Sequence, residues 1–339
     1  MRYPQFLKNN ATVGLLATSC GNNVNPYRIR AQVGIKNFEA LGYKINRGHR
    51  VFANYNATSA PHENRAKDFN LFYKNKNIDF LWSTGGGEIM LGMLPFVDFE
   101  KIKNLPPKFF MGFSDNTNLT FTLTTICDVA TIYASSIGHY FSSNELDEES
   151  KNAFALMKGE KLEFVSYKYC SGPNTIKSEN PLVHSTYIDE VKWESLSGLN
   201  EEFSGRIIGG CIDVLITLCG TKFDKVNQFI EKYKNDGIIW YFDNCELNSC
   251  GLYRALFQLK LAGWFKYTRG FIIGRNGSSF EPLGYTFKQA LIDALSDFNV
   301  PVIYDADISH KGPCIPILNG SIAEVTYKDN KGRIKFLLK

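Results

Sequence analysis

Short apolar runs alternate with longer helical segments through most of this sequence, and this alternation restricts the fold more than any other feature. In the first half the runs are residues 13–17, 51–53, 79–82, 108–113 and 131–134. Between them, apolar residues recur three or four positions apart, the spacing of an amphipathic helix. Strands that alternate with helices predict a parallel sheet covered by helices on both faces. We therefore expect an α/β domain here.

The second half repeats the pattern, with apolar runs at 206–210, 237–242, 271–273 and 302–304. Two further runs, 322–327 and 334–338, flank a DNKG turn and predict a closing hairpin. A chain of 339 residues exceeds the size of one ordinary core. Because residues 142–180 are polar and irregular in pattern, we expect an N-terminal α/β domain over 1–165 and a second α/β domain over 180–339.

Composition excludes several classes of partner. The net charge is +4, from 38 basic and 34 acidic residues, and no long basic run suggests nucleic-acid binding. No apolar run reaches the roughly 18 residues that a membrane helix needs. The eight cysteines lack C-x-x-C spacing, so neither a disulfide framework nor a zinc site is expected. We expect a cytoplasmic protein without a membrane partner.

The stretch KFFMGFSDNTN carries the strongest indication of chemistry. It reads as a strand that passes through a tight turn at Ser114 into a helix beginning near Asn118. A serine at such a turn projects from the backbone, and the amides of the following helix point toward the group that it attacks. Gly112-Phe113-Ser114-Asp115-Asn116 matches the glycine-x-serine-x-glycine elbow except at its last position. A helix-capping turn without chemistry is the alternative.

Other strand ends supply partners for this serine, because active groups of parallel sheets collect at the carboxyl ends of strands. Asp243 ends one apolar run, Glu246 follows it, and His310 lies in the loop after the run at 302–304. A nucleophilic serine needs a base, and a histidine base needs a carboxylate to orient it. Taken alone, His310 also fits a solvated loop histidine and Asp243 a helix cap. His139 could line a cleft beside the substrate.

A glycine loop follows the run at 79–82, as Gly85-Gly86-Gly87. Backbone amides that carry no side chain can approach a developing oxyanion closely. We expect an amide of Gly86 or Gly87, together with the amide of Asp115, to form an oxyanion hole. A flexible turn or a phosphate cradle would also use three glycines, although the spacing of the known nucleotide-binding fingerprints is missing.

Several segments together resemble the LD-carboxypeptidase family of serine peptidases, most closely its microcin-C self-immunity branch. They are STGGGE, GFSDNTNLTFTL, GRIIGGCIDVLITLCGT, IIWYFDNCELN with RALFQLKLAGWF, and the histidine before GPCIPILNG. The resemblance implies a flavodoxin-like N-terminal domain, as in class I glutamine amidotransferases, an α/β C-terminal domain and an active site between them. It further implies a Ser-Glu-His triad without metal or cofactor, and a homodimer. The family's serine falls on Ser114, its glycine pair on Gly85 and Gly86, and its histidine on His310.

The acid departs from the family pattern. Family members usually have a glutamate directly after the apolar strand, where this sequence has Asp243, which is one methylene shorter. Glu246 is the alternative acid, but Asp243 is favoured because a strand end fixes its position.

The resemblance implies a serine carboxypeptidase that cleaves an L,D-type C-terminal amide bond in a short peptide such as a murein tetrapeptide. The alternatives are a hydrolase of peptidyl-nucleotides of the microcin-C type and a catalytically weak binding protein on the same scaffold. An amidotransferase is less favoured, because the elbow lacks a cysteine. Trp82 and Trp193 could offer a stacking surface to a nucleobase, although such residues more often lie in a core.

Overall fold

The computed structural model describes residues 1–339, which form two compact units. The first unit contains residues 1–161 and 176–186, and the second contains residues 162–175 and 187–339. None of the helices is both long enough and apolar enough to cross a membrane.

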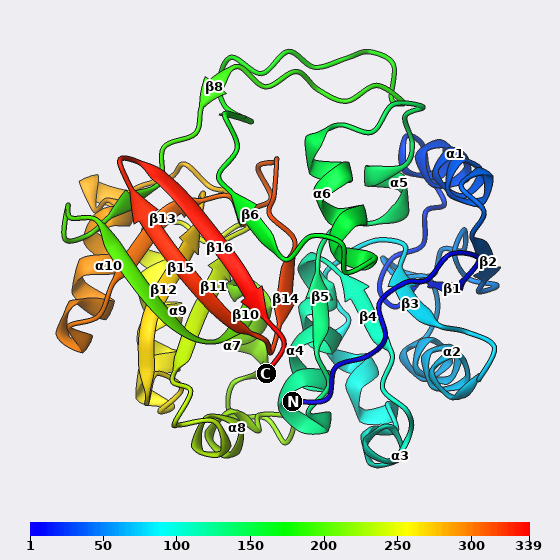
Figure 1. Cartoon of the computed structure of the whole chain (residues 1–339), viewed down its shortest axis with the longest axis horizontal. Coiled ribbons are helices and arrows are strands. Elements are labelled where there is room, and N and C mark those ends of the chain that lie inside the picture. Colours follow the sequence, from blue (N-terminus) through cyan, green and yellow to red (C-terminus); the bar gives the residue numbers. More distant parts are fainter. The chain divides into compact units, whose positions relative to one another are not determined.

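Five parallel strands form the sheet of the first unit (Figure 1), in the order β5-β4-β3-β1-β2. The strands are β1 (Thr12–Leu16), β2 (Lys44–Arg47), β3 (Phe80–Ser83), β4 (Phe109–Gly112) and β5 (Thr131–Tyr133). This order is that of flavodoxin-like folds. The prediction of a flavodoxin-like α/β domain is therefore confirmed.

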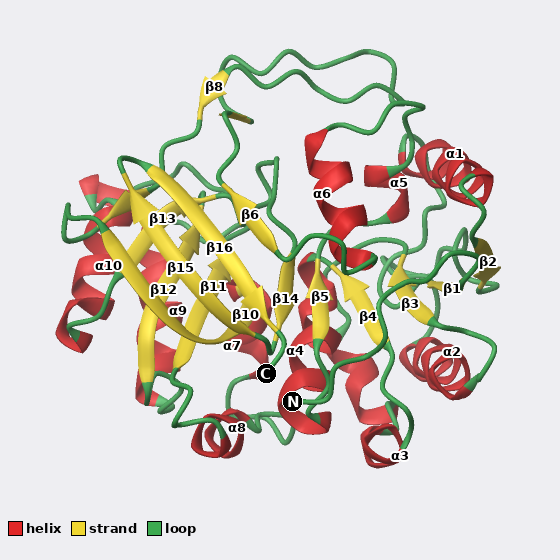
Figure 2. Ribbon diagram, viewed as in Figure 1, coloured by secondary structure: helices red, strands yellow, loops and turns green.

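Helices cover both faces of this sheet (Figure 2). Helices α1, α5 and α6 pack together on one face, and α2, η1, α3 and α4 lie on the other. The helical elements are α1 (Tyr27–Ala40), α2 (His62–Lys74), η1 (Leu91–Phe96), α3 (Phe99–Asn104), η2 (Ser114–Asn116), α4 (Thr117–Cys127), α5 (Ile137–Tyr140) and α6 (Glu148–Met157). Because helices cover both faces, β3 and β4 are buried along their whole length, which explains their continuous apolar sequences.

Two local predictions were wrong. The second strand is β2, with the polar sequence KINR, and residues 51–53 lie in a turn instead. Val51 is buried there, and its carbonyl accepts a 2.7 Å hydrogen bond from the amide of Asn22. The segment 142–180 is not irregular throughout, because α6 begins after Asp147, whose carboxylate caps the helix by accepting from the amide of Ser150.

The second unit contains an eight-stranded mixed sheet in the order β6-β16-β15-β10-β11-β12-β13-β9. Its strands are β6 (Glu163–Val165), β9 (Glu194–Ser195), β10 (Glu201–Cys211), β11 (Ile238–Asp243), β12 (Thr268–Gly274), β13 (Val302–Ala306), β15 (Ile322–Lys328) and β16 (Lys331–Leu337). Strands β10 to β13 are parallel, whereas β15, β16 and β6 add antiparallel pairs. The hairpin predicted from the last two apolar runs is confirmed by β15 and β16.

The remaining elements connect these strands. Strands β7 (Tyr169–Cys170) and β8 (Asp189–Glu190) form a separate pair, and β14 (Ile317–Asn319) follows β13. The helices are α7 (Ile212–Leu218), α8 (Val226–Lys232), α9 (Ser249–Leu261), η3 (Pro282–Gly284), α10 (Phe287–Leu295) and η4 (Ser296–Phe298). Helix α9 packs against both α7 and α10. The second unit is thus α/β, as expected.

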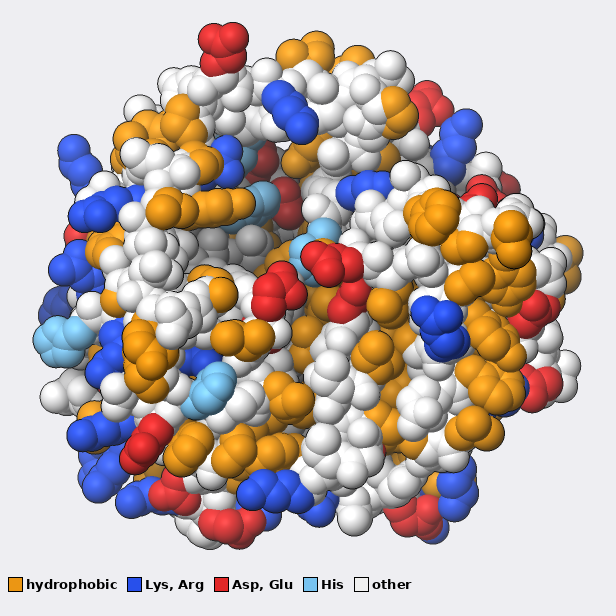
Figure 3. Space-filling model, turned by 180° about the vertical axis from the view of Figure 1, so that it is seen from behind, with side chains coloured by type: hydrophobic (Ala, Val, Ile, Leu, Met, Phe, Trp, Pro, Cys, Tyr) orange, Lys and Arg blue, Asp and Glu red, His pale blue; other side chains and the backbone are white.

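Charged side chains of both signs are interspersed over the surface visible in Figure 3. This distribution accords with the small net charge of +4. It does not resemble the single-sign stripe that backbone phosphates of nucleic acids require.

Candidate active site

Ser114 occupies a constrained turn at the carboxyl end of β4. Its φ angle is +61°, a left-handed conformation that costs a residue with a side chain about 1–2 kcal/mol. The backbone then enters η2 and α4 directly, so Ser114 stands between a buried strand and the amino end of a helix. This is the geometry of a nucleophile elbow, in which a sharp strand-to-helix turn exposes the serine hydroxyl.

Hydrogen bonds from the next two residues fix this turn. The buried carboxylate of Asp115 accepts from the hydroxyl of Ser19 and, at 3.0 Å each, from the amide of Met90 and the side chain of Asn118. Burial raises the pKa of Asp115, and these hydrogen bonds oppose the rise. Because its side chain is held in the interior, Asp115 can present only its backbone amide to a substrate.

Asn116 joins the turn to the glycine loop. Its Nδ2 donates to the carbonyl of Gly85 at 2.8 Å and to that of Phe113 at 3.1 Å, while its Oδ1 accepts from Thr18 at 2.6 Å. The sequence analysis did not assign this role to Asn116. Asn116 lies two residues after the serine and contacts the glycine loop that follows the adjacent strand. Its place next to the serine in the sequence could have indicated this role.

The glycine loop lies directly beside the serine. A Cβ atom added to Gly86 would lie 3.1 Å from Cβ and 3.5 Å from Oγ of Ser114. At Gly87, which has a φ of +155°, it would lie 2.3 Å from Oγ of Ser19 and 2.7 Å from Sγ of Cys20. A side chain at Gly87 would clash with Ser19 and Cys20, and one at Gly86 would require Ser114 to move by a few tenths of an ångström. The backbone of Gly86 therefore lies directly against the serine side chain.

A cavity of about 390 Å³ opens against this loop within the first unit. The glycine loop, Tyr27, Arg30, Ser136 and His139 are among the groups that line it. Burial would lower the pKa of His139, but the buried carboxylate of Glu149, 3.2 Å away, raises it above its usual value. Arg30 thus brings positive charge to this cavity, whereas the charge of His139 is balanced by Glu149.

His310 and Asp243 form a close pair in the second unit. Nδ1 of His310 lies 2.8 Å and 3.0 Å from the two carboxylate oxygens of Asp243, and the backbone amide of His310 donates to the same group at 3.2 Å. Asp243 is fully buried at the end of β11, whereas the His310 side chain is 22% exposed. The aspartate side chain is therefore long enough to reach the histidine.

Opposing effects set the ionisation of His310. Burial disfavours the imidazolium, but the Asp243 carboxylate and its hydrogen bond, with a smaller contribution from Cys245, raise the pKa of His310 to about 10. The carboxylate also selects the tautomer with a proton on Nδ1, so Nε2 is the nitrogen through which His310 would exchange a proton. Such a pair can serve as the base and orienting acid of a triad.

The side chain of Glu246, the alternative acid, is exposed to solvent. Its backbone amide and that of Cys245 donate to the carboxylate of Asp213, at 3.0 Å and 2.9 Å. Asp213 thereby ties the loop after β11 to the first turn of α7. The structure brings His310 to Asp243 and shows no such contact for Glu246.

Arg275 braces the loop that carries His310. It directly follows β12, is 9% exposed, and its guanidinium forms an ion pair with the buried Asp307. It also donates to the carbonyls of Lys311 at 2.7 Å and Pro313 at 2.8 Å. The sequence analysis did not identify Arg275, although its position at the carboxyl end of a strand could have suggested it.

The two tryptophans that could have offered a stacking surface are core residues, which was the alternative considered for them. Trp82 and Trp193 are fully buried, and their ring nitrogens donate to the carbonyl of Ser135 at 2.9 Å and to Asp307 at 3.0 Å. Neither ring face is available to a nucleobase, so that hypothesis was wrong.

Comparison with known proteins identifies relatives along nearly the whole chain. Residues 13–134 match the N-terminal domain of LD-carboxypeptidases, and residues 204–325 match their C-terminal domain. A Vibrio cholerae protein whose name describes a carboxypeptidase is 24% identical over 282 residues, which are 82% of this chain and 81% of that protein. The Escherichia coli microcin C7 self-immunity protein MccF is 22% identical over 331 residues, 94% of this chain and 91% of MccF.

Solved structures share the fold. An MccF-like protein from Bacillus anthracis superposes with a TM-score of 0.82 at 20% identity, covering 100% of both chains. MccF in complex with glutamyl sulfamoyl guanosine also gives 0.82 at 20% identity, covering 99% of this chain and 98% of that one.

Proposed function

The chain belongs to the LD-carboxypeptidase family, and from this premise we propose that it is a serine hydrolase that cleaves the C-terminal amide bond of a short peptide. The observation that carries the proposal is the strained Ser114 at the carboxyl end of β4, with the backbone of Gly86 against its side chain. A left-handed serine in contact with a glycine loop has no evident purpose in packing. It has one in acyl transfer, where nucleophile and oxyanion donors must be adjacent.

In the proposed reaction, Oγ of Ser114 attacks the scissile carbonyl and Nε2 of His310 takes its proton. The amides of Asp115 and of Gly86 or Gly87 stabilise the resulting oxyanion. The imidazolium then protonates the leaving amine, the C–N bond breaks, and an acyl-enzyme remains. Water, deprotonated by His310, hydrolyses that ester and restores the serine. Asp243 stays ionised throughout and stabilises the imidazolium.

This assignment has a consequence for pH dependence. A general base must be neutral, whereas Asp243 raises the pKa of His310 to about 10. In the free enzyme most of His310 is then protonated at neutral pH. The proposal therefore predicts that kcat/KM increases with pH up to about 10.

The cavity beside the glycine loop suggests how a chain terminus is recognised. Arg30 and His139 line this cavity, and a C-terminal carboxylate there would meet positive charge close to the oxyanion donors. The test compares a peptide acid with its C-terminal amide in wild type and in Arg30→Gln. We expect the substitution to raise KM for the acid and to leave the amide nearly unaffected. An equal effect on both peptides would contradict this role.

A second candidate is hydrolysis of a peptidyl-nucleotide. It is favoured by the relationship to MccF, whose solved complexes contain glutamyl sulfamoyl guanosine and aspartyl sulfamoyl adenosine. The burial of Trp82 and Trp193 means that any nucleobase would have to bind other residues.

Incubating the purified protein in parallel with a murein tetrapeptide and with aspartyl sulfamoyl adenosine separates the candidates. Release of D-alanine alone supports the carboxypeptidase, and cleavage of the second compound alone supports the nucleotide hydrolase. Ligand binding without turnover of either would instead support a binding protein on this scaffold. We also propose that the protein acts in the cytoplasm as a homodimer, and the oligomeric state can be checked by sedimentation equilibrium.

A further inference from the structure

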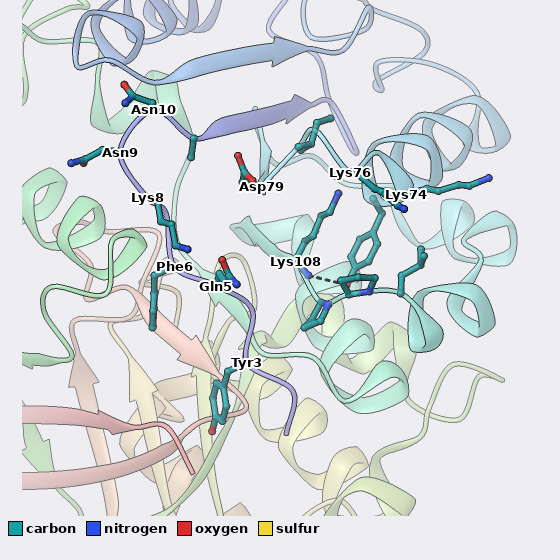
Figure 4. Close-up of a pocket in the computed structure, with 16 residues that line it drawn as sticks. Tyr3, Gln5, Phe6, Lys8, Asn9, Asn10, Lys74, Lys76, Asp79 and Lys108 are labelled. Carbon is teal, nitrogen blue, oxygen red and sulfur yellow. Dashed lines mark hydrogen bonds between the residues drawn. The ribbon is translucent and has the colours of Figure 1, made fainter.

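A second hollow, of about 680 Å³, lies at the opposite end of the first unit's sheet from Ser114 (Figure 4). Three stretches of chain enclose it: residues 3–11, the end of α2 with the residues that lead into β3, and residues 105–108 before β4. These are the amino ends of β1, β3 and β4, whereas Ser114 follows the carboxyl end of β4. The hollow is therefore separate from the proposed catalytic residues.

Positive charge dominates its lining. Lys8, Lys74, Lys76 and Lys108 contribute ammonium groups, and Asp79 is the one acidic residue among the lining side chains. Oδ2 of Asp79 already accepts a 2.8 Å hydrogen bond from the amide of Thr12, which occupies part of its capacity. The four ammonium groups outnumber the single carboxylate, so the hollow carries an excess of positive charge. Positive charge within a concave surface raises the local concentration of anions.

Lys108 is the most constrained of these cations. Its ammonium donates to the carbonyl of Asn75, and its backbone amide lies 3.3 Å from the hydroxyl of the buried Tyr73. Partial burial lowers the pKa of Lys108 to about 8, against the opposing charge of Asp79. Its positive charge is thus incompletely compensated, and an anion in the hollow would stabilise it.

The rest of the lining suits a small organic or inorganic anion. In the view of Figure 4, Gln5 lies between Lys8 and Lys108, and Asn9 and Asn10 follow Lys8 along the same segment. The carboxamide of Gln5 can donate to phosphate oxygens that the ammonium groups do not reach. Tyr3 and Phe6 add aromatic surface at the edge of the hollow.

We propose that this hollow binds a small polyphosphate anion, either free or as the phosphate chain of a nucleotide. Multiple ammonium groups distributed around one concavity match a ligand that carries several charges along a chain better than one with a single charge. The aromatic edge would add affinity only where a nucleoside is attached. The proposal does not depend on the proposed hydrolase activity.

Isothermal titration calorimetry with inorganic tripolyphosphate and with ATP tests this site. The main variant is Lys8→Gln/Lys76→Gln, whose two side chains are exposed and can be replaced without disturbing the core. Lys101→Gln, at an exposed lysine of α3, is the matched control for a lost charge. We expect the double variant to weaken binding about tenfold and the control less than twofold, because exposed charge pairs each contribute only modestly.

Two further measurements separate this site from others. Ser114→Ala should retain full affinity, since the serine lies at the other end of β4. Near pH 8, binding to wild type should take up to about half a proton, because the anion would raise the pKa of Lys108, and Lys108→Met should abolish this uptake. Tighter binding of ATP than of tripolyphosphate would identify a nucleotide, and equal affinity a free polyphosphate. Absence of binding, or equal losses in the double variant and Lys101→Gln, would overturn the proposal.

Discussion

Replacing Asp243 by asparagine removes the carboxylate that holds His310 while preserving the size of the side chain. In the wild type this group accepts from both Nδ1 and the backbone amide of His310. Both hydrogen bonds reach Oδ1, and the oxygen of an asparagine can still accept them but carries no charge. Burial, which lowers the pKa of His310, is then opposed only by the smaller effect of Cys245, so this pKa should fall well below about 10.

The size of this effect follows from the pKa. A rise from 6.5 to about 10 corresponds to a net stabilisation of the folded-state imidazolium on the order of 4–5 kcal/mol, to which Asp243 makes the largest favourable contribution. Because the folded-state pKa is raised, this contribution to stability is fully present below pH 6.5 and is lost as the pH rises through about 10. The free energy of unfolding of Asp243→Asn should therefore differ most from wild type near pH 6 and least above pH 10.

Nuclear magnetic resonance of the imidazole nitrogens measures the pKa directly. The chain contains five histidines, and His310→Gln assigns the relevant signal. Glu246→Gln is the matched control, since that side chain is exposed and three residues away. With a hydrolysable substrate, Asp243→Asn should lower kcat by about 10³–10⁴-fold, as expected when a triad histidine loses its orienting carboxylate. Glu246→Gln should stay within about twofold of wild type.

A His310 that titrates near 6.5 in the wild type would show that Asp243 does not raise its pKa. Full turnover in Asp243→Asn, or a greater loss in Glu246→Gln, would equally remove Asp243 from the proposed triad.

The remaining predictions concern residues that hold the candidate catalytic residues in position. Gly86→Ala should lower kcat about 10²-fold with an unchanged melting temperature, because a Cβ 3.1 Å from that of Ser114 must displace the serine by a few tenths of an ångström. Arg275→Met should lower the free energy of unfolding by about 3–5 kcal/mol in urea denaturation, since it leaves a buried carboxylate unpaired. Arg275→Lys keeps the charge but loses the hydrogen bonds to the loop that carries His310. We therefore expect kcat to fall at least tenfold with little change in KM. Arg254→Lys, at an exposed arginine, is the control.

Much of the fold was predictable because parallel strands buried on both faces leave a local signature. The runs FLWS and FFMG contain no charged residue and only one polar one, Ser83, and the structure buries each of their residues. The sequence KINR at β2 has no such signature, since an edge strand needs little apolar surface. The apolar residues at 51–53 therefore attracted a strand prediction that the turn around Val51 contradicts.

The candidate site was predictable at Ser114, where a residue with a side chain adopts an unfavourable turn conformation. Ser114 is a polar turn residue that follows an apolar strand and adopts a left-handed conformation. The motif around it spans only a few consecutive residues, so it can be recognised in the sequence. The bracing residues were not predictable in this way. Arg275 acts on a loop more than thirty positions later in the chain, and only the sheet topology brings them together.

Labelling with a fluorophosphonate tests the central claim most directly, because this reagent modifies a serine only when a base activates it. We predict that mass spectrometry will locate one modification on Ser114, that Ser114→Ala will abolish it, and that His310→Gln will slow it at least 10²-fold. Modification at another residue, or labelling of His310→Gln at the wild-type rate, would contradict the assignment of Ser114 and His310 as nucleophile and base.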